Sequence, residues 1–152
     1  METFHQILEL DEDGDHEFSH AMTEEYFEQA EETFRKLDKN LWVSIFNCSL
    51  LNVTFFLLVV PMCSKSANLK ELSALGHFLK GSSAAIGLEK VQASCEKIQC
   101  YGLKRDEEAK KDLEAGDALD KIQKQLVQLK AEYAEAKKSL KDWFRENETE
   151  FD

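Results

Sequence analysis

Four segments of the chain repeat apolar residues at steps of three and four, with charged side chains between them. This spacing predicts amphipathic helices that each bury one stripe. The segments cover residues 17–40, 69–86, 89–102 and 117–145, and a shorter stretch of the same kind covers 3–10. With one proline and six glycines in 152 residues, the chain also has few turn formers for a β-sandwich or barrel. We therefore expect an all-α fold, an antiparallel four-helix bundle with a short extra N-terminal helix.

The chain is acidic, and most of its negative charge lies at the N-terminal end. Its formal net charge is −11, and residues 1–40 alone carry 13 acidic and 3 basic side chains. Binding to nucleic acid or to an anionic membrane face requires a surplus of lysine and arginine. We therefore expect no nucleic-acid partner and no electrostatic attachment to a membrane.

The four cysteines are expected to be free thiols that hold no metal. The first ten residues include Glu2, His5 and Glu9 and lack the apolar stretch of a secretory signal, so we expect a reducing compartment. Cys95 and Cys100 are about 140° apart around a helix, which directs them away from a common metal ion.

Residues 41–66 do not share the helical pattern of their neighbours, and the stretch 41–63 has no charged residue at all. Our hypothesis is that 41–66 is a retained intron or a gene-model artefact. It would separate the bundle segments 1–40 and 67–146, which are followed by a frayed tail at 147–152. The rival interpretation is a membrane-prone loop, because about 20 apolar residues can span a bilayer. A membrane is expected as a partner only if 41–63 is genuine.

One predicted helix carries an exposed histidine among small residues. With about 100° of rotation per residue, His77 faces away from the apolar stripe of its helix, together with Ser73, Gly81 and Ala84. A glycine on such a surface costs about 1 kcal/mol relative to alanine. Access is a physical reason for it, because an exposed imidazole can accept a phosphoryl group near neutral pH and Lys80 can offset the added charge. Taken alone, the motif fits a surface histidine with an accidental glycine equally well.

The surrounding sequence resembles that of a known family. The string HFLKGSSAAIGL (77–88) is similar to the phosphorylation-site helix of histidine-containing phosphotransfer (HPt) domains. The similarity continues in CEKIQ (95–99) and in FSHAMTEEYFEQAEETFRKLD (18–38), and it covers most of the chain outside 41–66. Among HPt domains, the chain looks most like the fungal phosphorelay intermediates that link a membrane hybrid histidine kinase to response regulators in osmotic-stress signalling.

The resemblance implies a four-helix HPt bundle in which His77 is the phosphorylated residue. Lys80 and Gly81 would support it, and Gln99 would hydrogen-bond the imidazole and orient it. The implied activity is transfer without autonomous kinase activity, from the receiver domain of a hybrid histidine kinase to the receiver domains of response regulators. The chain would need no cofactor of its own, because the partner receiver domain supplies the aspartate and Mg²⁺.

The resemblance also places a docking surface for receiver domains on the first two helices and the site helix. The residues that it suggests, beside Gly81, are Ile7, Leu8, Leu10, Met22 and Phe27. It further implies a monomer in the cytoplasm and nucleus. His5, His16 and His20 lie in or near acidic turns and are expected to be solvated polar residues. The alternative function is a non-catalytic helical adaptor, or a membrane-tethered bundle, that has lost the relay.

Overall fold

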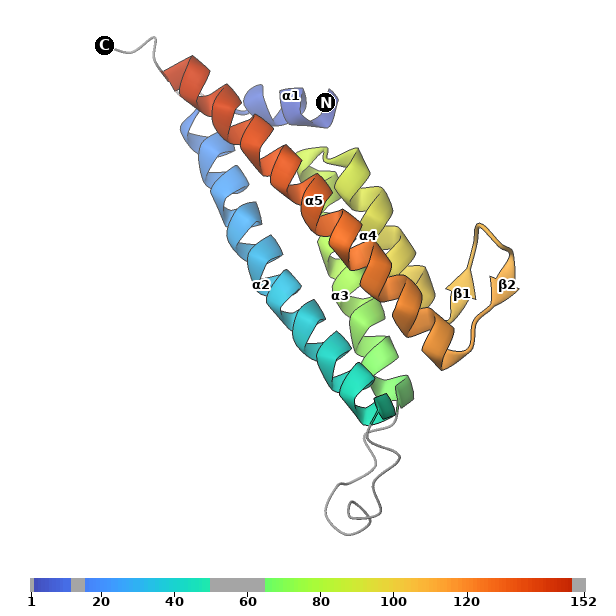
Figure 1. Cartoon of the computed structure of the whole chain (residues 1–152). Coiled ribbons are helices and arrows are strands. Elements are labelled where there is room, and N and C mark those ends of the chain that lie inside the picture. Colours follow the sequence, from blue (N-terminus) through green and yellow to red (C-terminus); the bar gives the residue numbers. More distant parts are fainter. Residues whose placement is uncertain (1, 12–15, 50–64, 149–152) are drawn as a thin grey trace.

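The computed structural model of the chain describes residues 2–11, 16–49 and 65–148. These residues form four bundle helices and a short N-terminal helix. Figure 1 shows that each bundle helix is antiparallel to the one before it and that the short helix lies across one end of the bundle. The elements are α1 (Glu2–Leu8), α2 (Glu17–Ser49), α3 (Lys65–Ile86), α4 (Glu89–Gly102) and α5 (Ala115–Glu148). The predicted fold, a four-helix bundle with a short extra N-terminal helix, is confirmed.

A two-stranded hairpin connects α4 to α5. Its strands are β1 (Arg105–Asp106) and β2 (Lys111–Asp112), which pair antiparallel. The Asp106 side chain is 3% exposed, and it accepts a 3.0 Å hydrogen bond from the backbone N–H of Ala109 and lies 3.0 Å from Nζ of Lys121 on α5. These contacts fix the hairpin to the beginning of the last helix.

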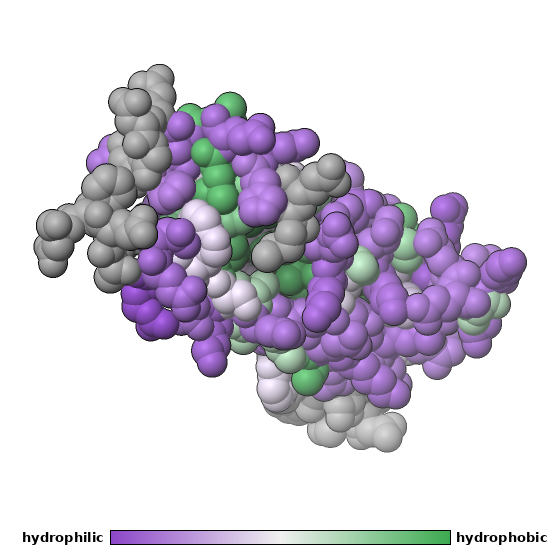
Figure 2. Space-filling model, turned by 90° about the horizontal axis from the view of Figure 1, so that it is seen from above, coloured by the Kyte–Doolittle hydropathy of each residue, from purple (hydrophilic) through white to green (hydrophobic). Residues whose placement is uncertain are grey.

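Helix α1 closes one end of the bundle. Its apolar residues Phe4 and Ile7 are buried, and the ring of Phe4 meets the edges of Trp143 and Phe144 on α5 at centroid distances of 5.5 and 6.0 Å. Seen from this end, the surface is mostly hydrophilic, with apolar atoms exposed in separate patches (Figure 2). The docking of α1 therefore covers apolar surface that the ends of the long helices would otherwise expose.

Two of the histidines predicted to be solvated are packed against aromatic rings. The His16 ring lies 5.2 Å from that of Trp143, and the His20 ring lies 5.0 Å from that of Phe144. Nδ1 of His16 is also 3.4 Å from a carboxylate oxygen of Asp11. The prediction was wrong for these two residues because the end of α5 reaches back to the start of α2, a contact that local charge does not reveal.

Helix α2 runs beyond its predicted end near residue 40 to Ser49. Leu41 and Ser44 are buried, and the Ser44 hydroxyl donates to the carbonyl oxygen of Asn40 at 2.7 Å. The first part of 41–66 therefore continues α2, and Leu41 belongs to the core. Residues 50–64 lie outside the described residues, so the hypothesis of an intron or gene-model artefact stays a prediction. No helix in the described part of the chain is long and apolar enough to cross a membrane.

Candidate functional site

Helices α3 and α4 approach each other so closely that a Cβ atom would clash at Gly102 and would be tightly packed at Gly76. A Cβ atom on Gly76 would lie 3.0 Å from the backbone nitrogen of Gln99 and 3.1 Å from the carbonyl oxygen of Cys95. A Cβ atom on Gly102 would lie 2.7 Å from the carbonyl oxygen of Leu69 and 2.7 Å from Cβ of Ser73. The backbone of α4 therefore runs directly beside the turn of α3 that precedes the predicted phosphorylation site.

This close approach changes the environment of Ser73. We expected Ser73 to be exposed on the face of His77, but it is buried, and its hydroxyl donates a 3.0 Å hydrogen bond to the carbonyl oxygen of Gln99. The prediction was wrong because α4 covers this flank of α3. Ser73 instead helps to fix the two helices that carry the predicted site residues.

His77 is exposed on α3, as predicted. No hydrogen bond or ion pair holds its imidazole within the described part of the chain. Gly81 lies one turn further on, and no described atom would come within 4 Å of a Cβ atom built on it. Ala84 is half-buried. The flank of His77 towards Gly81 is therefore open, whereas α4 borders the flank towards Gly76.

Lys80 is paired with a residue that the sequence did not single out. Its Nζ atom lies 3.2 Å from Oε1 of Glu96 on α4, and the two side chains are 27% and 52% exposed. Glu96 stands one turn before Gln99 on the same helix. Lys80 is thus held by an ion pair between the two helices.

Gln99 lies beside this turn of α3, but no hydrogen bond joins it to His77 in this structure. Its Oε1 atom is buried and has no partner among the described residues. Leaving a buried acceptor unpaired costs about 1–3 kcal/mol, so an N–H donor brought to this atom would be favourable. The role of Gln99 in orienting the imidazole therefore stays a prediction.

The residues predicted for docking divide into exposed and buried ones. Leu10 is 63% exposed, and Leu8 and Met22 are partly buried against the core. Ile7 and Phe27 are 6% and 2% exposed, so as core residues they have almost no surface with which to contact a partner. The family resemblance suggested these residues as apolar positions of the first two helices, and it did not separate the exposed positions from the buried ones.

Sequence reasoning missed two exposed apolar side chains on the site helices. Phe78, directly after His77, is 51% exposed, and Leu103, at the end of α4, is also 51% exposed. Large apolar groups in such positions are typical of surfaces that bind other proteins. The position of Phe78 directly after His77 could have indicated this, since Phe78 does not belong to the apolar stripe of its helix.

Two of the cysteines can be placed in the fold. Cys95 is buried and Cys100 is half-buried, and both are free. Burial raises the pKa of the Cys95 thiol to about 12. The described residues contain no group of three or more histidine, cysteine, aspartate or glutamate residues that could hold a metal ion. The side chains of Cys48 and Cys63 lie outside what the structure describes.

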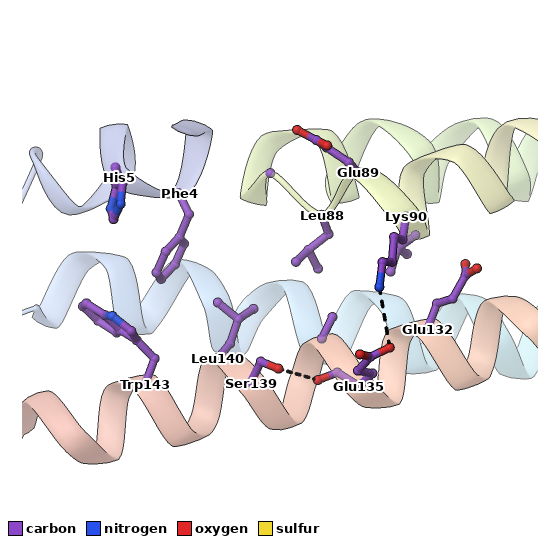
Figure 3. A pocket seen from close by; sticks show the side chains of 13 residues that line it. Phe4, His5, Leu88, Glu89, Lys90, Glu132, Glu135, Ser139, Leu140 and Trp143 are labelled. Atoms are coloured by element: carbon purple, nitrogen blue, oxygen red, sulfur yellow. Dashed lines mark hydrogen bonds and ion pairs between the residues drawn. The ribbon is translucent and has the colours of Figure 1, made fainter. Parts of the chain in front are cut away.

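A cavity of about 380 Å³ lies between α1, the start of α4, and α5. Figure 3 shows Phe4, Leu88, Leu140 and Trp143 on its apolar wall. At its edge, Nζ of Lys90 lies 3.9 Å from Oε2 of Glu135. None of the predicted phosphotransfer residues lines it. It is a feature of the α1 end of the bundle, separate from the surface around His77.

Comparison with known proteins shows the family to which this chain belongs. The family model of the Hpt domain matches residues 21–138, which is most of the chain. The chain therefore belongs to the Hpt domain family.

Similar proteins are found among fungal phosphorelay components. The chain is 39% identical over 145 residues to multistep phosphorelay regulator 1 of Schizosaccharomyces pombe, covering 95% of this chain and 41% of that protein. It is 40% identical to phosphorelay intermediate protein YPD1 of Candida albicans and 34% identical to YPD1 of Saccharomyces cerevisiae, each over 101 residues. Those two matches cover 66% of this chain and 42% and 47% of the relatives. The chain thus spans less than half the length of these relatives, and the predicted resemblance to fungal phosphorelay intermediates is confirmed.

Proposed function

We propose that this chain is a phosphotransfer intermediate of a multistep phosphorelay and that His77 carries the phosphoryl group. The observation that supports this most is an exposed histidine that no described residue binds, with no described atom in the space one turn away at Gly81, in a member of the Hpt family. An imidazole is an effective nucleophile near neutral pH. A partner active site needs unobstructed access to its ring, and Gly81 leaves that access free.

The transfer consists of two displacements at phosphorus. In the first, one ring nitrogen of His77 attacks an aspartyl phosphate on a receiver domain. The N–P bond forms while the P–O bond breaks, and the aspartate carboxylate leaves with the bonding electrons. In the second, a carboxylate oxygen of another receiver aspartate attacks the phosphorus, and the imidazole leaves. The other ring nitrogen keeps its proton throughout, and the unpaired Oε1 of Gln99 is the acceptor that we propose for it.

The receiver domains supply the remaining chemistry in this proposal. They contribute the phosphorylated aspartate and the Mg²⁺ that stabilises the transferring group, so the chain has no cofactor of its own and no autonomous kinase activity. What it contributes is a positioned nucleophile and a surface on which the receiver docks. The upstream partner would be the receiver domain of a hybrid histidine kinase, and the downstream partners would be response regulators.

The docking surface that we propose combines predicted and newly found residues. Leu10, Leu8 and Met22 have exposed or partly exposed side chains, and Phe78 adds apolar area next to His77. Ile7 and Phe27 would support this surface from the core. We further propose that the chain is a monomer, that it is located in the cytoplasm and nucleus, and that it acts in osmotic signalling.

The test is transfer from a purified, phosphorylated receiver domain to the purified chain. The wild type is expected to acquire a label that is stable in base and labile in acid, as a phosphohistidine is, whereas His77→Gln acquires none. His5→Gln is the matched control, because it removes another exposed histidine and should label normally. Circular dichroism should show equal helicity in all three proteins. A His77→Gln chain that labels like the wild type would contradict the assignment, and a wild type that never labels would favour a non-catalytic adaptor.

A further inference from the structure

The ion pair between Lys80 and Glu96 joins the two helices of the candidate site. Lys80 lies one turn after His77 on α3, and its Nζ atom is 3.2 Å from the Glu96 carboxylate on α4. Gly76 brings the α4 backbone against α3 at the turn before His77, which places Glu96 within reach of Lys80. The lysine that would meet the phosphoryl group is therefore already engaged by a carboxylate before that group arrives.

Phosphorylation of His77 would add a second anion to the surroundings of this lysine. A phosphoryl group carries close to two negative charges near neutral pH and strong acceptor oxygens. One ammonium group cannot neutralise both it and the Glu96 carboxylate. Glu96 therefore favours the unphosphorylated state, in which Lys80 is its partner, over the phosphorylated state, in which the two anions compete for Lys80.

We propose that Glu96 is a positioning residue that lowers the stability of phosphorylated His77 by competing for Lys80. The inference rests on the proposed function and adds to it a determinant of the direction of transfer. A less stable phosphohistidine passes its group more readily to a response-regulator aspartate. The carboxylate acts through Lys80 and need not touch the transferring phosphorus.

The experiment measures the equilibrium between a phosphorylated receiver domain and the full chain. Glu96→Gln keeps the shape of the side chain and removes its charge. It is expected to raise the equilibrium constant for phosphorylation of His77 by about two- to fivefold, the range that exposed ion pairs reach. In a Lys80→Ala background, the same substitution is expected to change the constant by less than about 1.5-fold, because the group for which the anions compete is gone. Glu135→Gln is the control, since it also removes one carboxylate that pairs with a lysine of α4.

The possible outcomes separate this inference from the proposed function. Failure of the wild type to take up label would overturn both. If the wild type labels, the inference alone is overturned by an unchanged or lower constant in Glu96→Gln. It is equally overturned by an equal effect in the Lys80→Ala background, or by an equal shift in Glu135→Gln, which would indicate a general effect of net charge. A rise that is specific to Glu96 and depends on Lys80 supports it.

Discussion

Gly81 is expected to lower the stability of the chain while it keeps the site accessible, and substitution can separate these two effects. The residue lies inside α3, is exposed, and has no described atom within 4 Å of the position where a Cβ would stand. A methyl group can therefore be added without a steric conflict. Glycine is less favourable than alanine in an exposed helix interior by about 1 kcal/mol. Gly81→Ala should thus raise the free energy of unfolding by about 1 kcal/mol and the melting temperature by about 2–4 °C.

A longer side chain at the same position should stabilise the helix and obstruct the site. In Gly81→Gln, the added atoms project one turn from His77 on the side where a receiver domain would approach. A misplacement of about 1 Å between reacting groups can cost about 100-fold in rate. We therefore expect the rate of phosphoryl transfer to fall by about 10- to 100-fold, while the free energy of unfolding stays at or above the wild-type value.

Urea denaturation followed by far-ultraviolet circular dichroism measures the stability, and rapid-quench transfer from a phosphorylated receiver domain measures the rate. Gly116→Gln is the matched control, because Gly116 is also an exposed helical glycine with no described atom within 4 Å. It should leave the transfer rate unchanged. A loss of stability in Gly81→Ala would refute the claim that the position has free space. Wild-type transfer in Gly81→Gln would refute the argument that the glycine provides access.

Two further predictions concern the contacts that position the site and its neighbouring hairpin. In Gly76→Ala, the new methyl group meets the α4 backbone at a cost of about 1–3 kcal/mol, which cancels or exceeds the helix-propensity gain of about 1 kcal/mol. Urea denaturation should therefore show none of the stabilisation expected for Gly81→Ala, and an equal gain at both positions would refute the close approach. The backbone N–H of Ala109 and the ammonium group of Lys121 lower the pKa of Asp106 from 3.8. The stability that follows from this shift is present above pH 3.8 and is lost as the pH falls towards the lower pKa of the folded state. Asp106→Asn should therefore be less stable than the wild type at neutral pH and lose less stability on acidification, and parallel acid-unfolding curves would contradict this.

The helices could be predicted because their signals are local. Apolar residues at three- and four-residue steps identified all four long helices, and Gly87 adopts φ +79° directly after α3. Such a residue ends a helix with no Cβ penalty. The end of α2 was predicted too early because the residues from 41 to 49 carry no charge. Without a polar face, the sequence there has no amphipathic periodicity to follow, although Leu41 and Ser44 remain buried.

The surroundings of the site could be predicted only in part, because they depend on how α3 and α4 pack. His77 and Gly81 were identified from their own helix, since exposure and small size can be inferred from helical spacing. The pairing of Lys80 with Glu96 is a contact between residues 16 positions apart, and it depends on the register of the two helices. That register follows from the close approach at Gly76. In a single sequence, a glycine at this position indicates only a weak helix former.

Gly76 and Gly81 lie on the same helix, and their opposite surroundings explain how one short segment can build this site. At Gly76 the missing side chain is replaced by the backbone of α4, and the contact brings Glu96 and Gln99 towards the histidine. At Gly81 no described part of the molecule fills the space that a side chain would occupy. At Gly76, packing against α4 offsets the low helix propensity of glycine. At Gly81 no such packing exists among the described residues, so only Gly81 lowers the stability of the folded chain, by about 1 kcal/mol. A residue that lowers stability without a packing role is most readily explained by what must approach it, and the histidine one turn away is the group that a partner would have to reach.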